Sequence, residues 1–182
     1  MASWWNPANL LTVLRLALVP CIAIAILNER HLAALILFFL AGVTDGIDGP
    51  LARRFHWSSR AGAYLDPIAD KVLLSTVYIC LAVIDALPWW FVAVVFGRDI
   101  LILLAAGLAL AFSRVRKFPP SVWGKFSTFL QIVTAVVWMS KKAFRPLTLD
   151  SIAAVLLWLT TAATAWSGIH YTWRGAQMLR NR

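Results

Sequence analysis

Acidic residues are scarce in this chain. Aspartate and glutamate together number eight, against 17 lysines and arginines, which gives a formal net charge of +9. Half of the acidic residues fall in one short stretch, as Asp45, Asp48, Asp66 and Asp70. In a chain that is 61% hydrophobic, an ionised carboxylate carries a large desolvation penalty unless cations or water compensate it. We therefore interpret this cluster of four carboxylates as a functional site.

Cysteine and histidine are also rare, with two and three copies. Cys21 and Cys80 fall inside apolar runs, where a small hydrophobic role is favoured over a disulfide or a metal site. Only His56 lies near the aspartates in the sequence, which argues against zinc. The basic residues form no helix or aromatic-interleaved groove clear of the apolar runs, so the sequence argues against nucleic-acid binding.

Long apolar runs dominate what is present. The mean hydropathy of +0.76 and the ten tryptophans are typical of an integral membrane protein. Six runs are long enough to cross about 30 Å of hydrocarbon as helices. They lie near 8–28, 31–53, 62–86, 89–112, 122–140 and 150–172. We predict an all-α, polytopic membrane protein in which residues 1–182 form a single transmembrane catalytic domain, with no soluble domain left to place.

The basic residues predict an orientation, because short cytoplasmic loops carry the excess of lysine and arginine. With both termini inside, the inner side holds ten: Arg53, Arg54, Arg60, Arg114, Arg116, Lys117, Lys125, Arg174, Arg180 and Arg182. The outer side holds four, namely Arg30, Lys141, Lys142 and Arg145. The amino-terminal residues lack the basic region of a signal peptide. We expect a bacterial inner-membrane protein with the aspartates at the cytoplasmic face, although the Lys141–Lys142 pair runs against this orientation.

The spacing of the aspartates predicts two helical stripes. One stripe contains Asp45, Asp48, Gly49 and Ala52, and the other contains Gly62, Asp66 and Asp70. The connection between them is short enough for antiparallel helices, so the four carboxylates can converge. A cluster of hard oxygen ligands suits Mg²⁺ or Mn²⁺. We therefore predict a site for one of these divalent ions between the two helices.

Two other interpretations of this region are close packing of helices and cation transport. Small residues let membrane helices pack closely, which explains the glycines but not four aspartates. A cation-coupled transporter would also cluster intramembrane carboxylates, but it needs a path across the membrane. Acidic residues in the outer halves are confined to loop edges, at Glu29, Asp85 and Asp150. The sequence therefore favours an enzyme, with a transporter as the remote alternative.

The order of the residues carries a family resemblance. The pattern Asp45-x2-Asp48-Gly49-x2-Ala52-Arg53-x8-Gly62-x3-Asp66-x3-Asp70 resembles the signature of the CDP-alcohol phosphotransferase family of membrane phospholipid synthases. The resemblance implies that family's fold of six transmembrane helices, with the signature on the second and third. It also implies displacement of CMP from a CDP-linked lipid by an alcohol, and a homodimer.

The resemblance also implies roles for individual residues. Asp45, Asp48 and Asp66 match metal ligands, while Asp70 completes the metal site or acts as the general base on the acceptor hydroxyl. The residues expected to bind CDP-diacylglycerol are Asn9, Thr12, Gly49, Ala52, Arg53 and Gly62. Asn9, Thr12 and Arg15 share one helical face. Arg15 is expected to meet a phosphate or an acidic partner, the alternative being an arginine that snorkels to the membrane surface.

Later segments bear on the acceptor. Gly97-Arg98-Asp99 and Gly124-Lys125-Phe126-Ser127-Thr128 resemble the branch that makes cardiolipin, although that branch usually has Asn at the position of Ser127 and Ser at that of Gly124. We expect transfer to phosphatidylglycerol, giving cardiolipin and CMP. The alternative is a phosphatidylglycerophosphate synthase that uses glycerol 3-phosphate. The residues expected to hold the acceptor headgroup are Arg60, Arg98, Arg114, Arg116, Lys117, Lys125 and Ser127.

Overall fold

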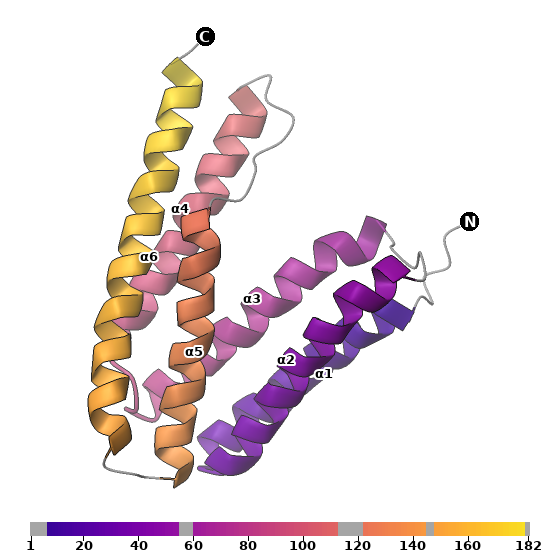
Figure 1. Cartoon of the computed structure of the whole chain (residues 1–182), viewed down its shortest axis with the longest axis vertical. Coiled ribbons are helices and arrows are strands. Elements are labelled where there is room, and N and C mark those ends of the chain that lie inside the picture. Colours follow the sequence, from indigo (N-terminus) through magenta and orange to yellow (C-terminus); the bar gives the residue numbers. More distant parts are fainter. Residues whose placement is uncertain (1–6, 55–59, 113–121, 145–147, 181–182) are drawn as a thin grey trace. The chain divides into compact units, whose positions relative to one another are not determined.

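The computed structural model describes residues 7–54, 60–112, 122–144 and 148–180 (Figure 1). These residues form six α-helices: α1 Pro7–Leu27, α2 His31–Arg54, α3 Arg60–Val83, α4 Trp89–Phe112, α5 Val122–Phe144 and α6 Thr148–Arg180. The predicted all-α architecture is confirmed for them. The predicted boundaries differ most for α6, which continues past the expected end at 172 because polar residues such as Arg174 and Gln177 tolerate helical structure as readily as apolar ones do.

The helices group into two compact units. The first contains α1, α2, α3 and the last residues of α5, from Met139 onward. The second contains α4, the rest of α5 and α6. Within the described residues, Val122–Phe144 and Thr148–Trp173 are long and apolar enough to cross a membrane, and shorter apolar stretches cover Leu11–Leu27 and His31–Thr44.

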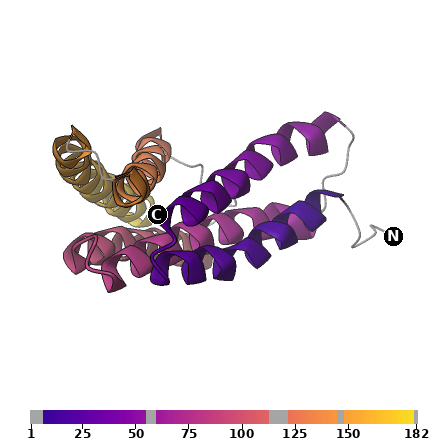
Figure 2. The same cartoon turned by 90° about the horizontal axis from the view of Figure 1, so that it is seen from below.

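The first unit is built around α1, which packs against both α2 and α3 (Figure 2). Its buried side chains include Ile22 and Ile26 on α1 and Val77 and Tyr78 on α3. On α2 the buried positions include small ones such as Ala34, and small side chains let membrane helices approach each other closely. A tight turn joins α1 to α2, as the short connection in the sequence predicts.

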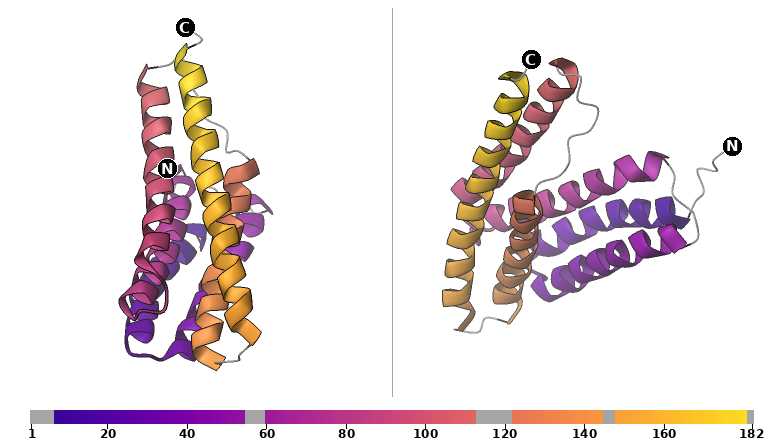
Figure 3. Two further views of the ribbon diagram at one scale, coloured as in Figure 1. Left: turned by 90° about the vertical axis from the view of Figure 1, so that its left-hand side faces the viewer. Right: turned by 45° about the horizontal axis from the view of Figure 1, so that its top comes forward.

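The second unit is held together by contacts of α6 with both of its neighbours (Figure 3). Trp90 of α4 and Trp158 of α6 lie with their ring centroids 5.4 Å apart. Between α5 and α6 runs a ladder of buried polar side chains: Ser127 bonds Thr164 at 3.1 Å, Gln131 donates to Thr164 at 3.2 Å, and Thr134 bonds Thr160 at 2.7 Å. We call this set the polar ladder. These bonds pair the hydroxyl groups and the Gln131 amide nitrogen where the surrounding side chains and lipid supply no water.

The outer surfaces of both units are apolar. Phe39 and Ile24 in the first unit, and Leu103 and Trp173 in the second, each expose more than half of their surface, at 67%, 59%, 73% and 62%. A soluble protein rarely shows apolar residues of this size over so many helices. The surface is that expected of helices that contact lipid.

The polar ladder generates a prediction about stability. Thr160→Val removes the hydroxyl bonded across the helix interface to Thr134 while preserving the shape of the side chain. Because one interhelical hydrogen bond in a membrane protein is worth about 0.6 kcal/mol and at most about 1.7 kcal/mol, we expect a loss of that size. Thermal unfolding in detergent measures it.

The neighbouring threonine provides the matched control. The Thr161 hydroxyl donates to the carbonyl of Leu157 in its own helix, so Thr161→Val leaves the α5–α6 interface intact. Equal destabilisation by the two substitutions would contradict a role for the ladder in joining the helices.

Candidate functional site

Two side chains of α1 reach two carboxylates of α3. The Thr12 hydroxyl donates a hydrogen bond of 2.5 Å to Oδ1 of Asp66. One turn further on, Nη1 of Arg15 donates to Oδ1 of Asp70 at 2.8 Å and forms an ion pair with it. Thr12 and Arg15 share a face of α1, and Asp66 and Asp70 share a face of α3, because they are three and four residues apart. The packing of α1 on α3 brings the two faces together.

Burial differs sharply between the two sides of these contacts. Thr12 and Arg15 are each only 1% exposed, whereas the Asp70 side chain is 49% exposed. The expectation that Arg15 meets an acidic partner is confirmed, and Arg15 does not snorkel to the surface. Asp70 is therefore fixed by a buried cation while half of its carboxylate side chain stays accessible.

The remaining residues of the signature are placed only by their helices. Asp45, Asp48, Gly49, Ala52 and Arg53 lie in the last turns of α2. Their side chains, and those of Asn9, Arg60 and Gly62, lie outside the described part of the structure. Arg114, Arg116 and Lys117 fall in a segment that is not described at all. The helical spacing of the two predicted stripes is confirmed, and the convergence of all four carboxylates stays a prediction.

The donor chemistry of the described residues fits a divalent ion. Asp66 and Asp70 present carboxylate oxygens from adjacent turns of α3, and one oxygen of each is already fixed by Thr12 or Arg15. Oxygen donors of this kind suit Mg²⁺ or Mn²⁺. Among the described residues no group of three or more His, Cys, Asp or Glu side chains gathers.

A second polar centre lies in the second unit, around Arg98 of α4. Its guanidinium is 7% exposed and donates to Asp99 at 2.8 Å and to Ser167 of α6 at 3.0 and 3.3 Å. A longer bond of 3.4 Å reaches the carbonyl of Gly124 on α5. Arg98 thus ties α4 to both α5 and α6.

Gly124 is closely packed where Arg98 meets α5. A Cβ added at Gly124 would lie 3.0 Å from the Tyr171 hydroxyl and 3.2 Å from Nη2 of Arg98, closer than either group tolerates without shifting. Beside this point a groove of about 450 Å³ opens. It is lined by Arg98, Ile102, Gly124, Lys125, Thr128, Phe129, Ile132 and Tyr171. We call it the Arg98 groove.

The structure separates the acceptor residues that the sequence grouped. Arg98 and Lys125 line the Arg98 groove, while Ser127 is fully buried in the polar ladder against Thr164. Sequence reasoning missed Ser167 and Tyr171. A signal for them exists, because Thr160, Thr164, Ser167 and Tyr171 recur every three or four residues and so share one face of the helix.

Comparison with known proteins decides the family. The sequence model of the CDP-alcohol phosphatidyltransferase family matches residues 5–166, which is most of the chain. The chain belongs to this family. The match runs from the start of α1 into α6, so it includes Thr12, Arg15, both carboxylate stripes and Arg98. This is a family of membrane proteins that need a divalent metal, in agreement with the predicted fold and with the oxygen donors on α3.

The relatives of this chain include proteins with two different enzyme names. A rat CMP-forming cardiolipin synthase is 32% identical over 98% of this chain, and the human protein of that name is 30% identical over 97%. A probable phosphatidylglycerophosphate synthase of Mycobacterium tuberculosis H37Rv is 38% identical over 70% of the chain. The chain spans 65%, 65% and 63% of the lengths of these three proteins, which is just under two thirds.

The contact between Arg15 and Asp70 generates a prediction. In a double-mutant cycle of Arg15→Gln and Asp70→Asn, the free energies of unfolding should show a coupling of about 1 kcal/mol. We expect the low end of the usual range because half of the Asp70 side chain is exposed. Unfolding in detergent, followed by circular dichroism, measures each variant.

The control cycle pairs Arg15→Gln with Asp85→Asn. Asp85 is exposed beyond the end of α3 and has a φ of 51°, which asparagine adopts readily. A coupling as large in this cycle as in the first would show that the energy does not come from the ion pair.

Proposed function

We propose that this protein transfers the phosphatidyl group of CDP-diacylglycerol to phosphatidylglycerol, giving cardiolipin and CMP. The observation that carries the proposal is the environment of the Asp70 carboxylate. It forms an ion pair with the buried Arg15, and about half of the side chain is accessible. It lies one turn from Asp66, in the positions that the family signature reserves for its last two aspartates. A carboxylate so placed can accept a proton from a bound alcohol.

The proposed reaction is one displacement at phosphorus. The acceptor hydroxyl oxygen bonds to the phosphorus of the phosphatidyl group, the bond from that phosphorus to the CMP oxygen breaks, and Asp70 takes the hydroxyl proton. CMP leaves with the bonding electron pair. A divalent ion, when held there, would neutralise the diphosphate and the charge that builds up on CMP. We assign Asp45, Asp48 and Asp66 to hold that ion, with Asp70 completing the set.

Thr12 is proposed to position one of these ligands. Its hydroxyl donates to one oxygen of Asp66, which orients the carboxylate and leaves the second oxygen for a cation. The other residues assigned to CDP-diacylglycerol are Asn9, Gly49, Ala52, Arg53 and Gly62. Glycine and alanine at three of these positions would let a flat nucleotide approach the helix backbone.

The assignment of phosphatidylglycerol as acceptor is supported by two observations. The cardiolipin synthases of rat and human match this chain over 98% and 97% of its length, and so across α4, α5 and α6, whereas the mycobacterial protein matches over 70%. The Arg98 groove also combines Lys125 with the apolar side chains of Phe129 and Ile132. A cation beside an apolar wall suits a lipid acceptor better than a small, doubly charged phosphomonoester.

The remaining acceptor residues and the cellular setting belong to the same proposal. Besides Arg98 and Lys125, the acceptor headgroup is assigned to Arg60, Arg114, Arg116 and Lys117, whereas Ser127, which the sequence grouped with them, is buried in the polar ladder. We propose Mg²⁺ or Mn²⁺ as the ion, a homodimer as the assembly, and a bacterial inner membrane with the site at the cytoplasmic face. A phosphatidylglycerophosphate synthase is the second candidate, because the mycobacterial relative of that name is 38% identical.

An acceptor panel distinguishes the two candidates. The purified protein in liposomes with Mg²⁺ and labelled CDP-diacylglycerol should release CMP with phosphatidylglycerol and at least tenfold less with glycerol 3-phosphate. Labelled lipid products are separated and quantified for each acceptor. Release with glycerol 3-phosphate alone would replace the proposed acceptor, and no release with any alcohol would overturn the enzyme assignment.

The role of Asp70 can be tested separately. Asp70→Asn keeps the size of the side chain but removes the proton acceptor, so turnover should fall by at least about 100-fold, the usual contribution of a general base. Binding of CDP-diacylglycerol with Mg²⁺ should largely persist. Asp85→Asn makes the same chemical change outside the site and should retain full activity. Turnover of Asp70→Asn within a few fold of the unmodified protein would refute the base role.

A further inference from the structure

The basic residues at the α1–α2 turn and at the end of α5 have no part in the proposed transfer. A pocket of about 560 Å³ lies there, within the first unit. Its lining comes from the turn and the start of α2, with Glu29, Arg30, His31, Leu32, Ala33 and Ile36, and from α5, with Lys142 and Ala143. We call it the turn pocket. Lys142 belongs to the pair whose position ran against the predicted orientation.

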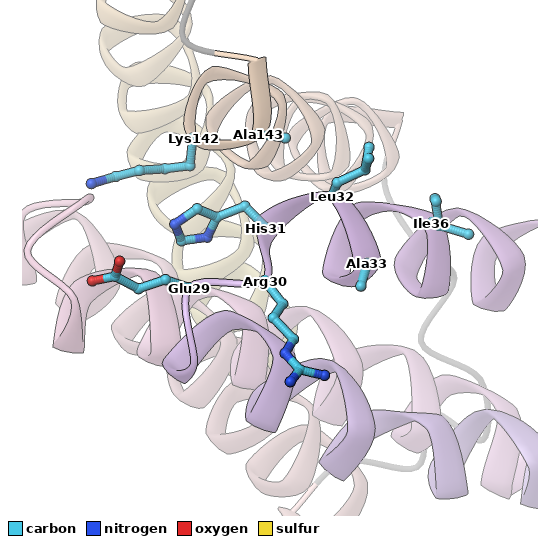
Figure 4. Close-up of a pocket in the computed structure, with 8 residues that line it drawn as sticks. All are labelled: Glu29, Arg30, His31, Leu32, Ala33, Ile36, Lys142 and Ala143. Atoms are coloured by element: carbon cyan, nitrogen blue, oxygen red, sulfur yellow. The ribbon is translucent and has the colours of Figure 1, made fainter.

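Charged and polar groups gather at one side of the turn pocket (Figure 4). The His31 ring lies between the side chains of Lys142 and Glu29, while the Arg30 side chain extends the other way from the turn. The formal charges of Lys142 and Glu29 cancel at this side, and Arg30, which extends the other way, gives the lining as a whole a net charge of +1 when His31 is neutral. One monoanionic group neutralises this lining.

We propose that the turn pocket binds the headgroup of an anionic phospholipid that carries a single phosphodiester and hydroxyl groups, the chemistry of phosphatidylglycerol. Lys142 and His31 donate hydrogen bonds to the phosphodiester oxygens, and Glu29 accepts one from a headgroup hydroxyl. A zwitterionic lipid has no net charge and leaves the lining at +1. Charge complementarity therefore selects the anionic lipid.

An apolar stripe on α2 shows why the ligand is a lipid rather than free phosphate. Leu32 and Ile36 line the pocket and are 50% and 51% exposed. Phe39, Leu40 and Val43 continue the same helical face, at 67%, 50% and 40% exposure. The stripe begins at the pocket and runs along an exposed side of the helix. A bound headgroup would thus have its acyl chains against an apolar surface.

The turn pocket is distinct from the proposed transfer site. Arg15 and Glu29 are fourteen residues apart on α1 and the turn that follows it, which corresponds to roughly 20 Å along the helix axis. Asp66 and Asp70 contact the opposite end of α1 from the pocket. Headgroup binding therefore takes place near the other membrane surface and does not rest on the proposed function.

The experiment is native mass spectrometry of the purified full chain in detergent, titrated with phosphatidylglycerol, phosphatidylethanolamine or phosphatidylcholine. The unmodified protein should retain phosphatidylglycerol at least fivefold more tightly than either zwitterionic lipid. Lys142→Ala should weaken that binding about fivefold, as expected for one lysine at a lipid surface. Lys142→Arg keeps the charge and should restore it.

Lys141→Ala is the matched control, because Lys141 is the adjacent lysine on α5 and does not line the pocket. It should bind phosphatidylglycerol like the unmodified protein. Equal losses in the two alanine variants, or equal retention of all three lipids by the unmodified protein, would overturn the proposal. Displacement of the lipid by millimolar inorganic phosphate would overturn the lipid assignment. Because the readout is binding alone, these results are independent of whether CMP is released.

Discussion

The pairing of Arg15 with Asp70 is the interaction on which the first unit depends. A guanidinium that is 1% exposed cannot remain charged among apolar side chains without a partner, since desolvation alone costs several kcal/mol. Asp70 supplies the compensating charge at 2.8 Å and thereby fixes both the rotation and the height of α1 against α3. Once Arg15 is fixed, Thr12 lies one turn away on the same face and reaches Asp66. The contact that stabilises the packing also arranges the two carboxylates.

The second unit also contains a buried arginine, and different residues compensate its charge. Arg98 is nearly as buried as Arg15, but its charge is met by its sequence neighbour Asp99, and Ser167 satisfies further donors. The polar ladder adds uncharged pairs between α5 and α6. In each case a polar side chain inside the apolar helices is satisfied by another helix or by an adjacent residue. Polar contacts therefore set which helix faces meet, because apolar contacts with lipid and with protein are similar in energy.

Much of the helical pattern could be predicted from the sequence, because long apolar runs indicate helices. All six runs became helices, and the two aspartate stripes lie on α2 and α3 as their spacing requires. The sequence predicted that Arg15 contacts a phosphate or an acidic residue, but it did not identify Asp70 as that residue. Helical periodicity shows which residues share a face, whereas the choice of Asp70 depends on how α1 is rotated and shifted against α3.

The residues expected to hold the acceptor could not be grouped correctly from the sequence. Arg98, Lys125 and Ser127 were grouped because they lie in two segments that resemble one branch of a family. Ser127 and Lys125 are two residues apart on a helix, so they point to different faces. Lys125 lines the Arg98 groove, and Ser127 enters the polar ladder. Tyr171 reaches the same groove from a distant part of the sequence, and only tertiary packing reveals such a neighbour.

The Asp70 side chain is paired with Arg15 and is also partly accessible, and both properties matter for the proposed reaction. A fully buried and fully paired carboxylate would be inaccessible to an alcohol, and a fully exposed one would have no fixed position. Asp70 is 49% exposed and is held on one side by the ion pair with Arg15. Because Arg15 occupies one side of the carboxylate, an acceptor hydroxyl can approach only the open side. The same buried cation that fixes the helix packing thus restricts proton transfer to the face of Asp70 where an acceptor can approach.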